Sequence, residues 1–234
     1  HLFSTKDIKG AIIAPLVEGS SEIEHLFKLK MINYPFVLLE DVKGIQANVV
    51  AIDNIKAIKK AVKYLIDGGH TKIVHFAGPP ASSHTEERIE GFRYAFSESS
   101  LVFNNDMIVS IGSRHEESYS NTMAYFKSRP RSEYPTAIVC FNDQQALSVI
   151  TALKELDIKV PDDISIIGND DVAYAKLYPV PLTTISAPQY EIGRRAAEIL
   201  IKNIESHTLL PPERVILQTE LIIRESTRAI NKKD

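Results

Sequence analysis

The strongest constraint on the fold is a strand–helix–strand pattern between Pro135 and Ile185. Short runs of apolar and β-branched residues, Ala137 to Phe141 and Ile164 to Ile167, are typical of buried strands. Apolar residues recur at helical spacing between these two runs, at Ala146, Leu147, Ile150 and Leu153. Two strands joined through a helix form a βαβ unit, which requires a parallel sheet. The sequence therefore predicts an α/β fold built on parallel strands.

Polar residues follow both of these strands, at the point where each strand would end. Asn142 and Asp143 follow the first strand, and the segment from Gly168 to Asp171 follows the second. In an open parallel sheet, ligands bind beyond the carboxyl ends of the strands. We therefore expect amide and carboxylate groups from both strand ends to line one binding crevice.

Strands and helices alternate along the rest of the chain, which predicts a doubly wound sheet. The further expected strands are Ala11 to Ala14, Phe36 to Leu39, Asn48 to Ile52, Ile73 to Ala77, Met107 to Ile111, Val215 to Leu217 and Leu221 to Arg224. The clearest helix runs from Asn54 to Asp67, where one apolar stripe ends at Gly68 and Gly69. A long helix after Pro188 is expected to direct Ile192, Ala196, Leu200 and Ile201 inward.

The composition is that of a globular protein with a modest negative charge. Apolar residues make up 44% of the 234 residues, which is enough for a buried core. No run of about 18 apolar residues is present, so we expect no membrane-spanning helix. The net charge of −3 argues against nucleic-acid binding by this segment, because phosphate contacts require a basic surface. The single cysteine, Cys140, excludes an internal disulfide, which suits the cytoplasm.

The motifs of common enzymes are missing from the sequence. It contains no GxGxxG, P-loop, HExxH, CxxC or GxSxG pattern. Asp170 and Asp171 are adjacent, so their side chains cannot both face one substrate along an extended backbone. The histidines lack metal-ligand spacing, and His75 is expected to be a packed or surface residue. We therefore predict a binding protein with no catalytic residue, no cofactor and no metal site.

Four segments, taken in order, resemble a known family. They are PTAIVCFNDQQALSVITAL, VPDDISIIGNDD, PLTTISAPQYEIGRRAAEIL and the closing ELIIREST. This pattern is similar to the effector-binding domain of the lactose-repressor and galactose-repressor (LacI/GalR) family of bacterial transcription factors, from about Ile8 to Arg228. Four linked motifs in the right order are far more specific than a lone glycine box.

The resemblance implies a periplasmic-binding-protein-like fold of type I, with two doubly wound parallel-sheet lobes joined by three crossovers. The amino-terminal lobe would comprise residues 1–52 and 187–209, the carboxy-terminal lobe residues 53–186 and 210–228, and residues 229–234 would form a tail. The segment from Lys9 to Ile13 would correspond to the third strand of the family's amino-terminal lobe. A helix-turn-helix reader and a first strand–helix–strand would then precede this chain, and the amino-terminal lobe would be incomplete.

The same resemblance implies a function. A small polar effector, a sugar or sugar derivative, would bind in the cleft between the lobes of a dimeric, cytoplasmic repressor. Operator DNA would be read only through the preceding helix-turn-helix segment. The alternative is a periplasmic sugar-binding protein of a transport system, which would share the lobes and the cleft. The block from Pro181 to Ala196 and the closing Ile-Arg-Glu-Ser-Thr resemble the regulators.

One predicted loop and helix start gathers hydrogen-bond donors. Ser82 and Ser83 lie there, and Ser83 forms a capping box with Glu86. Backbone amides at a helix start favour polar or anionic ligands. From spacing alone, Arg88 is either a ligand contact or a solvated charge on a capped helix. The resemblance favours the contact, because the family's effector-binding arginine lies three residues before the pair that corresponds to Gly91–Phe92.

The resemblance adds four further ligand-binding residues. Asp170 would accept hydrogen bonds from ligand hydroxyls while Asp171 closes the turn, the alternative being that both only shape the loop. Asn142 would donate to the ligand and accept from it. Arg114 stands where many relatives stack an aromatic on the sugar, and it indicates an acidic or hydroxyl-rich ligand unless it is an exposed loop arginine. Gln189 completes the predicted set.

An apolar and aromatic stretch, from Val172 to Tyr178, follows the predicted ligand loop. Its composition is typical of the centre of an interface. In the resembled family's dimer, Tyr119 and the helix from Gln144 to Leu153 would lie beside it. The predicted dimer contacts are Tyr119, Tyr174, Leu177 and Tyr178. The alternative is that Tyr174 and Tyr178 fold back onto their own lobe.

Overall fold

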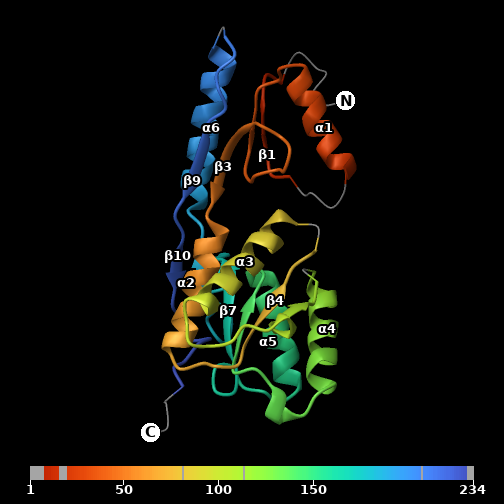
Figure 1. Cartoon of the computed structure of the whole chain (residues 1–234), viewed down its shortest axis with the longest axis vertical. Coiled ribbons are helices and arrows are strands. Elements are labelled where there is room, and N and C mark those ends of the chain that lie inside the picture. Colours follow the sequence, from red (N-terminus) through yellow and green to blue (C-terminus); the bar gives the residue numbers. More distant parts are fainter. Residues whose placement is uncertain (1–7, 16–19, 81, 113, 207, 231–234) are drawn as a thin grey trace. The chain divides into compact units, whose positions relative to one another are not determined.

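The chain divides into two compact units. The structure is a computed structural model that describes residues 8–15, 20–80, 82–112, 114–206 and 208–230 (Figure 1). Unit 1 comprises His1–Asp53, Ala81–Ser83 and Pro188–Gln218. Unit 2 comprises Asn54–Pro80, His84–Ala187 and Thr219–Asp234. The predicted changes of lobe near Ile52 and Ser186 lie close to these boundaries.

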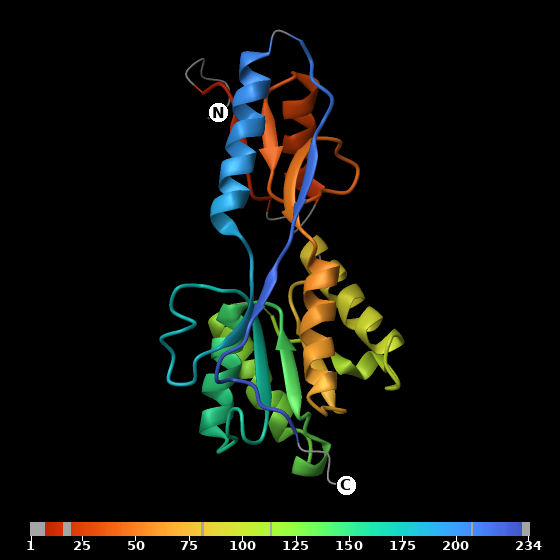
Figure 2. The ribbon, with the colours of Figure 1, turned by 90° about the vertical axis from the view of Figure 1, so that its left-hand side faces the viewer.

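Unit 1 is a four-stranded parallel sheet with strand order β1-β2-β3-β9 (Figure 2). Its strands are β1 (Ala11–Ile13), β2 (Phe36–Leu38), β3 (Asn48–Ile52) and β9 (Arg214–Leu217). Its helices are α1 (Ser20–Met31) and α6 (Gln189–Glu205). Side chains alternate between the two faces of a strand. Val37 and Val50 accordingly pack with Ala196 and Ile199 of α6, whereas Leu38 packs on the face covered by α1.

The predicted boundary near Leu210 is wrong, because β9 belongs to the sheet of unit 1. Val49 to Ile52 pair in parallel with Arg214 to Leu217. The chain changes units at Gln218 and Thr219 instead. The sequence gives little sign of this change, since these two residues alone separate β9 from β10 (Glu220–Ile222). The two closing strands were expected in one sheet, and they lie in different sheets.

Unit 2 is a six-stranded sheet in the order β10-β8-β7-β6-β4-β5. The remaining strands are β4 (Ile73–Ala77), β5 (Ile108–Ser110), β6 (Ala137–Cys140), β7 (Ser165–Asp170) and β8 (Thr183–Ser186). The helices are α2 (Asn54–Asp67), α3 (Ser83–Ser97), α4 (His115–Lys127) and α5 (Asp143–Glu155), with 3-10 turns η2 (Asn105–Met107) and η3 (Arg131–Glu133). β10 pairs antiparallel with β8, and the other described pairs are parallel. The predicted doubly wound α/β fold is confirmed.

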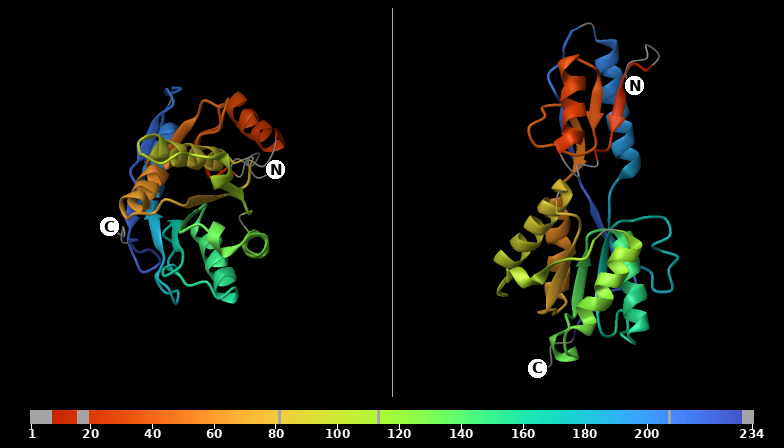
Figure 3. Two further views of the ribbon diagram at one scale, coloured as in Figure 1. Left: turned by 60° about the horizontal axis from the view of Figure 1, so that its bottom comes forward. Right: turned by 90° about the vertical axis from the view of Figure 1, so that its right-hand side faces the viewer.

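The central strands β4 and β6 of unit 2 are buried on both faces because helices cover both. Ile138 and Ile166 pack with residues of α5, and α4 lies against α5 (Figure 3). On the opposite face, Val139 and Ile167 pack with α2 and α3. This arrangement explains why β6 is a continuous apolar run and β4 is apolar except for His75, since strands covered on both faces need no alternating polar residue.

His75 is a core residue, which is the packed one of the two positions expected for it. It is fully buried in β4, its Nδ1 lies 2.9 Å from the Val139 carbonyl oxygen, and its ring stacks on Phe92. Burial lowers the pKa of His75 to about 4. The imidazole is therefore neutral at physiological pH, and its role is packing.

Two smaller predictions are wrong. Ile201 is 53% exposed, whereas Ala196 is buried. Successive residues of a helix are rotated by about 100°. Ile192, Ala196 and Leu200 are four residues apart and share one face, whereas Ile201, one residue further, points away from it. The tail was predicted to begin at residue 229, but the Ile230 amide donates to the Gly68 carbonyl at 2.7 Å. Residues 231–234 lie outside the described residues.

Candidate functional site

The carboxyl ends of β6 and β7 lie side by side and present polar groups. Val139 is in register with Ile167, which brings Asn142 and Asp170 to the same edge of the sheet. Asn142 is the N-cap of α5, because its side-chain oxygen accepts from the Gln145 amide at 2.8 Å. This capping role was not predicted, although an asparagine directly before a helix is its usual sequence signal.

Arg88 is buried at this edge, with 4% of its surface exposed. Its Nε donates to Asn54 Oδ1 at 3.1 Å, and its Nη1 donates to the Phe141 carbonyl oxygen. The guanidinium also lies 4.5 Å from the centre of the Phe141 ring, within the range of cation–π attraction. The alternative that Arg88 is a solvated surface charge is therefore wrong.

Gly78 makes the position of the Phe141 ring possible. A Cβ at residue 78 would lie 2.6 Å from atoms of this ring. Sequence reasoning missed Phe141 and Asn54 as partners of Arg88, because both contacts join segments far apart in the chain. Gly78, directly after β4, was the one local signal of the Phe141 contact, since a glycine at a strand end often marks a close approach of another group.

Asp170 lies near Arg88 and is partly open to solvent. Its Oδ1 lies 3.9 Å from Arg88 Nη2, and its side chain is 40% exposed. Asn169 Nδ2 donates to the same oxygen at 2.7 Å. Burial raises the pKa of Asp170, and the Arg88 charge opposes that shift. The arrangement places a guanidinium and a carboxylate side by side, and the carboxylate is accessible.

The carboxylates of the neighbouring Asp171 and Asp143 are bound to other groups of the protein. Arg224 Nη2 lies 2.6 Å from Asp171 Oδ1. Asp143, at the start of α5, is fully buried, and burial raises the pKa of its carboxyl group to about 6, against the opposing effect of hydrogen bonds from Thr184 and Val172. Asp143 was expected among the strand-end groups that line the binding crevice, but its buried carboxylate accepts hydrogen bonds within the protein instead.

The other predicted ligand residues are more widely distributed. Arg114 is exposed at the N-cap of α4, beyond the carboxyl end of β5. Ser82 and Ser83 are half-buried and belong to unit 1, as does the exposed Gln189, the first residue of α6. α3 begins at Ser83 itself. Within unit 2, the structure therefore brings together Arg88, Asp170 and the Asn142 segment.

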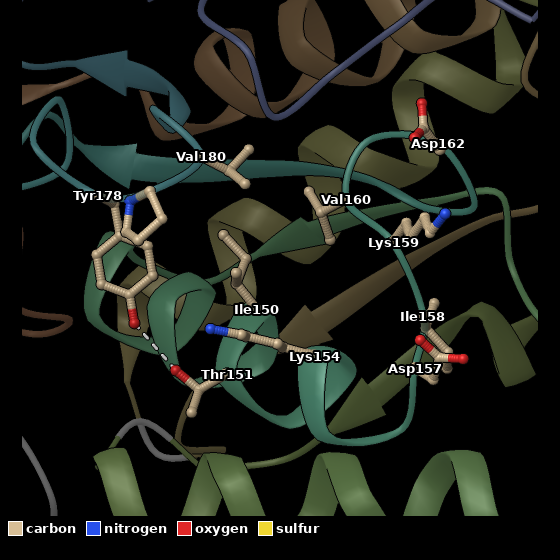
Figure 4. A pocket seen from close by; sticks show the side chains of 11 residues that line it. Ile150, Thr151, Lys154, Asp157, Ile158, Lys159, Val160, Asp162, Tyr178 and Val180 are labelled. Carbon is tan, nitrogen blue, oxygen red and sulfur yellow. Dashed lines mark hydrogen bonds between the residues drawn. The ribbon is translucent and has the colours of Figure 1, made fainter.

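The predicted dimer residues differ in exposure. Tyr174 is 49% exposed and Leu177 is 77% exposed. Tyr178 is half-buried, and its hydroxyl lies 3.0 Å from Thr151 Oγ1 of α5, so Tyr178 contacts its own lobe (Figure 4). Tyr119 is half-buried on α4 and donates to Glu155 Oε2 at 2.6 Å.

A cavity of about 520 Å³ lies beside this stretch. Its walls are α5, residues 157–162 and residues 178–180, with Ile150, Val160 and Val180 as apolar lining (Figure 4). Lys154 and Lys159 contribute its basic groups. The cavity does not involve Arg88 or Asp170, so it is separate from the edge described above.

Two further findings concern the described part of the chain. No group of three or more His, Cys, Asp and Glu residues there is arranged to hold a metal ion. None of the described helices combines the length and the apolar character needed to cross a membrane.

Comparison with known proteins places these features in a family. The model of the periplasmic binding protein-like domain matches residues 62–227. The HTH-type transcriptional repressors PurR of Vibrio vulnificus (strain CMCP6) and Vibrio parahaemolyticus serotype O3:K6 are 37% and 38% identical to this chain over 172 residues. Each alignment covers 73% of this chain and 50% of the relative, so the chain spans about half the length of these relatives.

Solved structures agree with this assignment. A regulatory protein of the LacI family from Chloroflexus aggregans is 26% identical, with a TM-score of 0.83 over 97% of this chain and 79% of that protein. A LacI family regulator from Enterococcus faecium, solved with bound ribose, shares the fold, with 24% identity and a TM-score of 0.81 over 96% of this chain and 81% of that protein. The chain belongs to the family of periplasmic binding protein-like domains, in the form found in LacI/GalR-type transcriptional regulators.

Proposed function

We propose that this chain is the ligand-sensing part of a transcriptional repressor, and that Arg88, Asn142 and Asp170 bind a sugar or a related small polar effector. The observation that carries the proposal is the buried Arg88 guanidinium beside the accessible Asp170 carboxylate at the carboxyl edge of the unit 2 sheet. A guanidinium donates hydrogen bonds and a carboxylate accepts them. Two adjacent hydroxyls of a polyol offer the complementary acceptor and donor.

Asn142 adds a donor to this pair. Its side-chain oxygen is used in capping α5, and its amide nitrogen can still donate to a ligand. Arg114, Ser82, Ser83 and Gln189 are proposed as further contacts on the family resemblance alone. We also propose that the protein is cytoplasmic, is not an enzyme and needs no cofactor. The regulator names of its relatives support this reading over a periplasmic transport protein.

Operator DNA would be bound by a helix-turn-helix segment outside this chain. The net charge of −3 supports this division of roles, because the surface of a DNA reader is normally basic. Effector control of such a reader requires that the ligand bind two conformations of the protein with different affinity. The relatives that carry the name HTH-type repressor are about twice as long as the aligned part.

Replacing Asp170 with asparagine tests the ligand role. We expect at least about a tenfold loss of effector affinity, since a hydrogen bond to a charged group contributes roughly 1.5–3 kcal/mol and 1.4 kcal/mol is tenfold. The melting temperature should hardly change, because asparagine has the same shape. The small molecules released from purified protein are first identified by mass spectrometry, and titration calorimetry then gives the affinity of parent and variant.

The matched control is Asp67→Asn, which removes a surface carboxylate paired with Lys63 at the end of α2. It should bind the effector as the parent does. An unaltered dissociation constant in Asp170→Asn would defeat the assignment.

We further propose that Tyr174 and Leu177 lie at the centre of a homodimer interface. Both are exposed apolar side chains close to the Asp170–Asp171 pair, here called the ligand turn, and a two-fold symmetric dimer would bury the same patch on both subunits. Tyr119 and Tyr178 would contribute from the flanks while keeping their contacts within the subunit. Continuity between the ligand turn and this patch supports a link between effector binding and association.

Aspartate at positions 174 and 177 is expected to shift the protein toward the monomer. Two unpaired charges would have to be desolvated at the interface, which costs several kcal/mol. Sedimentation velocity over a concentration series measures the change. The control is Leu209→Asp, because Leu209 is 79% exposed in unit 1 and lies outside the proposed patch. A full-length parent that stays monomeric at high concentration would refute the interface.

A further inference from the structure

The ligand turn of unit 2 has an unfavourable backbone. Asp170 and Asp171 have φ angles of 121° and 55°. Residues other than glycine rarely adopt positive φ, and such positions persist when surrounding contacts hold them. The turn directly precedes the exposed stretch that begins at Val172. Whatever holds this backbone therefore also sets the direction in which the Asp170 carboxylate points.

A buried carboxylate lies directly beneath this turn. Asp143 is fully buried at the first residue of α5. Its Oδ2 accepts from the Val172 amide at 2.9 Å, and its Oδ1 accepts from the Thr184 hydroxyl at 2.5 Å. One side chain thus joins α5, β8 and the first residue after the turn. Since a carboxylate only accepts hydrogen bonds when it is ionised, both donors are matched to its charged form.

Gly168 makes room for this carboxylate. A Cβ at residue 168 would lie 2.2 Å from Asp143 Oδ1. The glycine that begins the Gly168–Asp171 motif is therefore explained by the position of Asp143. This close approach adds β7 to α5, β8 and Val172 as segments that meet at the Asp143 side chain.

Arg224 holds the turn from a second side. Its Nη2 binds Asp171 Oδ1 at 2.6 Å, and its Nη1 donates to the Leu182 carbonyl at 2.8 Å. Arg224 fixes the side chain of Asp171, whereas Asp143 fixes the backbone one residue later. Asp170 is left as the member of the pair whose carboxylate is open to solvent.

We infer that Asp143 is a positioning residue, whose buried carboxylate holds the Asp170–Asp171 turn in its positive-φ conformation and ties it to the exposed stretch from Val172 to Leu177. The consequence of this positioning for effector recognition rests on the proposed function of Asp170. The positioning of the turn by Asp143 is independent of that function. The same carboxylate links the ligand turn to the proposed dimer patch through one hydrogen bond, at the Val172 amide.

Nuclear magnetic resonance on the ligand-free protein tests this role. In Asp143→Asn, we expect the Val172 amide to exchange with solvent at least about ten times faster and the α-carbon shift of Asp171 to move away from left-handed values. An asparagine cannot accept from both donors, because one of its two terminal groups is an NH2. The core amide of Val139 serves as the internal reference and should exchange at its parent rate.

Two further variants keep the test informative if Asp143→Asn fails to fold. Thr184→Val removes the hydroxyl with little change in shape and should accelerate exchange at Val172, though less than Asp143→Asn does. Thr184→Ser keeps the hydroxyl and should restore the parent behaviour. Asp163→Asn is the matched control, because Asp163 Oδ2 accepts from the Lys159 amide at 2.8 Å in an exposed turn elsewhere.

The outcomes separate the two proposals. Unchanged exchange and shifts at Val172 and Asp171 in both Asp143→Asn and Thr184→Val would overturn the positioning role. Equal acceleration at Val172 and Val139 would overturn it too, because that result indicates a general loss of stability. A normal effector affinity in Asp170→Asn would instead refute the proposed function and leave the positioning result in place.

Discussion

Replacing Arg88 with alanine is expected to lower the stability of unit 2 by roughly 2–4 kcal/mol and effector affinity by at least about tenfold. The variant leaves a buried acceptor, Asn54 Oδ1, and a half-buried acceptor, the Phe141 carbonyl, without their donor. A buried acceptor without a partner costs about 1–3 kcal/mol. Arg88→Ala also removes the cation next to Asp170. Urea denaturation followed by circular dichroism measures the first effect, and titration calorimetry the second.

Two variants separate charge from geometry in this experiment. Arg88→Lys keeps the positive charge and loses the planar fork of donors, so it should recover part of the stability and little of the affinity. Arg93→Ala is the matched control, because Arg93 is exposed on the same helix and lies over the Phe103 ring. If Arg88→Ala and Arg93→Ala bind the effector equally well, Arg88 is a structural residue only.

The architecture of unit 2 could be predicted from the sequence because local patterns determine it. The apolar runs at β4, β6 and β7 and the stripe of α2 give the elements and their parallel arrangement directly. The edge at which ligands bind follows from that arrangement. The positions of Asn142 and Asp170 at this edge could accordingly be predicted. A ligand role for Arg88 could be favoured only through the family resemblance, since spacing alone left open both a ligand contact and a solvated charge.

What the sequence did not predict depends on contacts between distant segments. Asn54, Phe141 and Asp143 act through partners that lie 29 or more positions away in the chain, at Arg88 for the first two and at Val172 for the third. β9 was misplaced because its pairing with β3 has no local signature. Tyr178 was read as interface, and its partial burial against α5 depends on the path of a loop.

The contrast between two helical glycines gives the other large expected effect. A Cβ at Gly91 of α3 would lie 2.4 Å from the Ile55 carbonyl oxygen and 3.0 Å from its Cα. Both are backbone atoms of α2, so they cannot move aside as a flexible side chain would. Gly91→Ala is expected to destabilise unit 2 by about 3 kcal/mol, because overpacking a close helix contact forces the backbones apart. Thermal unfolding followed by circular dichroism measures it.

The matched substitution is Gly193→Ala in α6, where an added Cβ meets no described atom within 4 Å. Alanine is favoured over glycine within a helix by about 0.5–1 kcal/mol, so this variant should be slightly more stable than the parent. The same chemical change thus has opposite signs at two helical positions. The sign depends on whether a neighbouring backbone occupies the space of the new methyl group.

Gly91 also bears on the ligand site, because its contact with Ile55 lies next to the bond between Arg88 and Asn54. Moving α3 away from α2 would pull the guanidinium from its acceptor and shift it relative to Asp170. We therefore expect Gly91→Ala to weaken effector binding as well, whereas Gly193→Ala should leave it at the parent value. A Gly91→Ala protein that is more stable than the parent would mean that α2 and α3 do not pack this closely, and the buried position of Arg88 would then lose its main support.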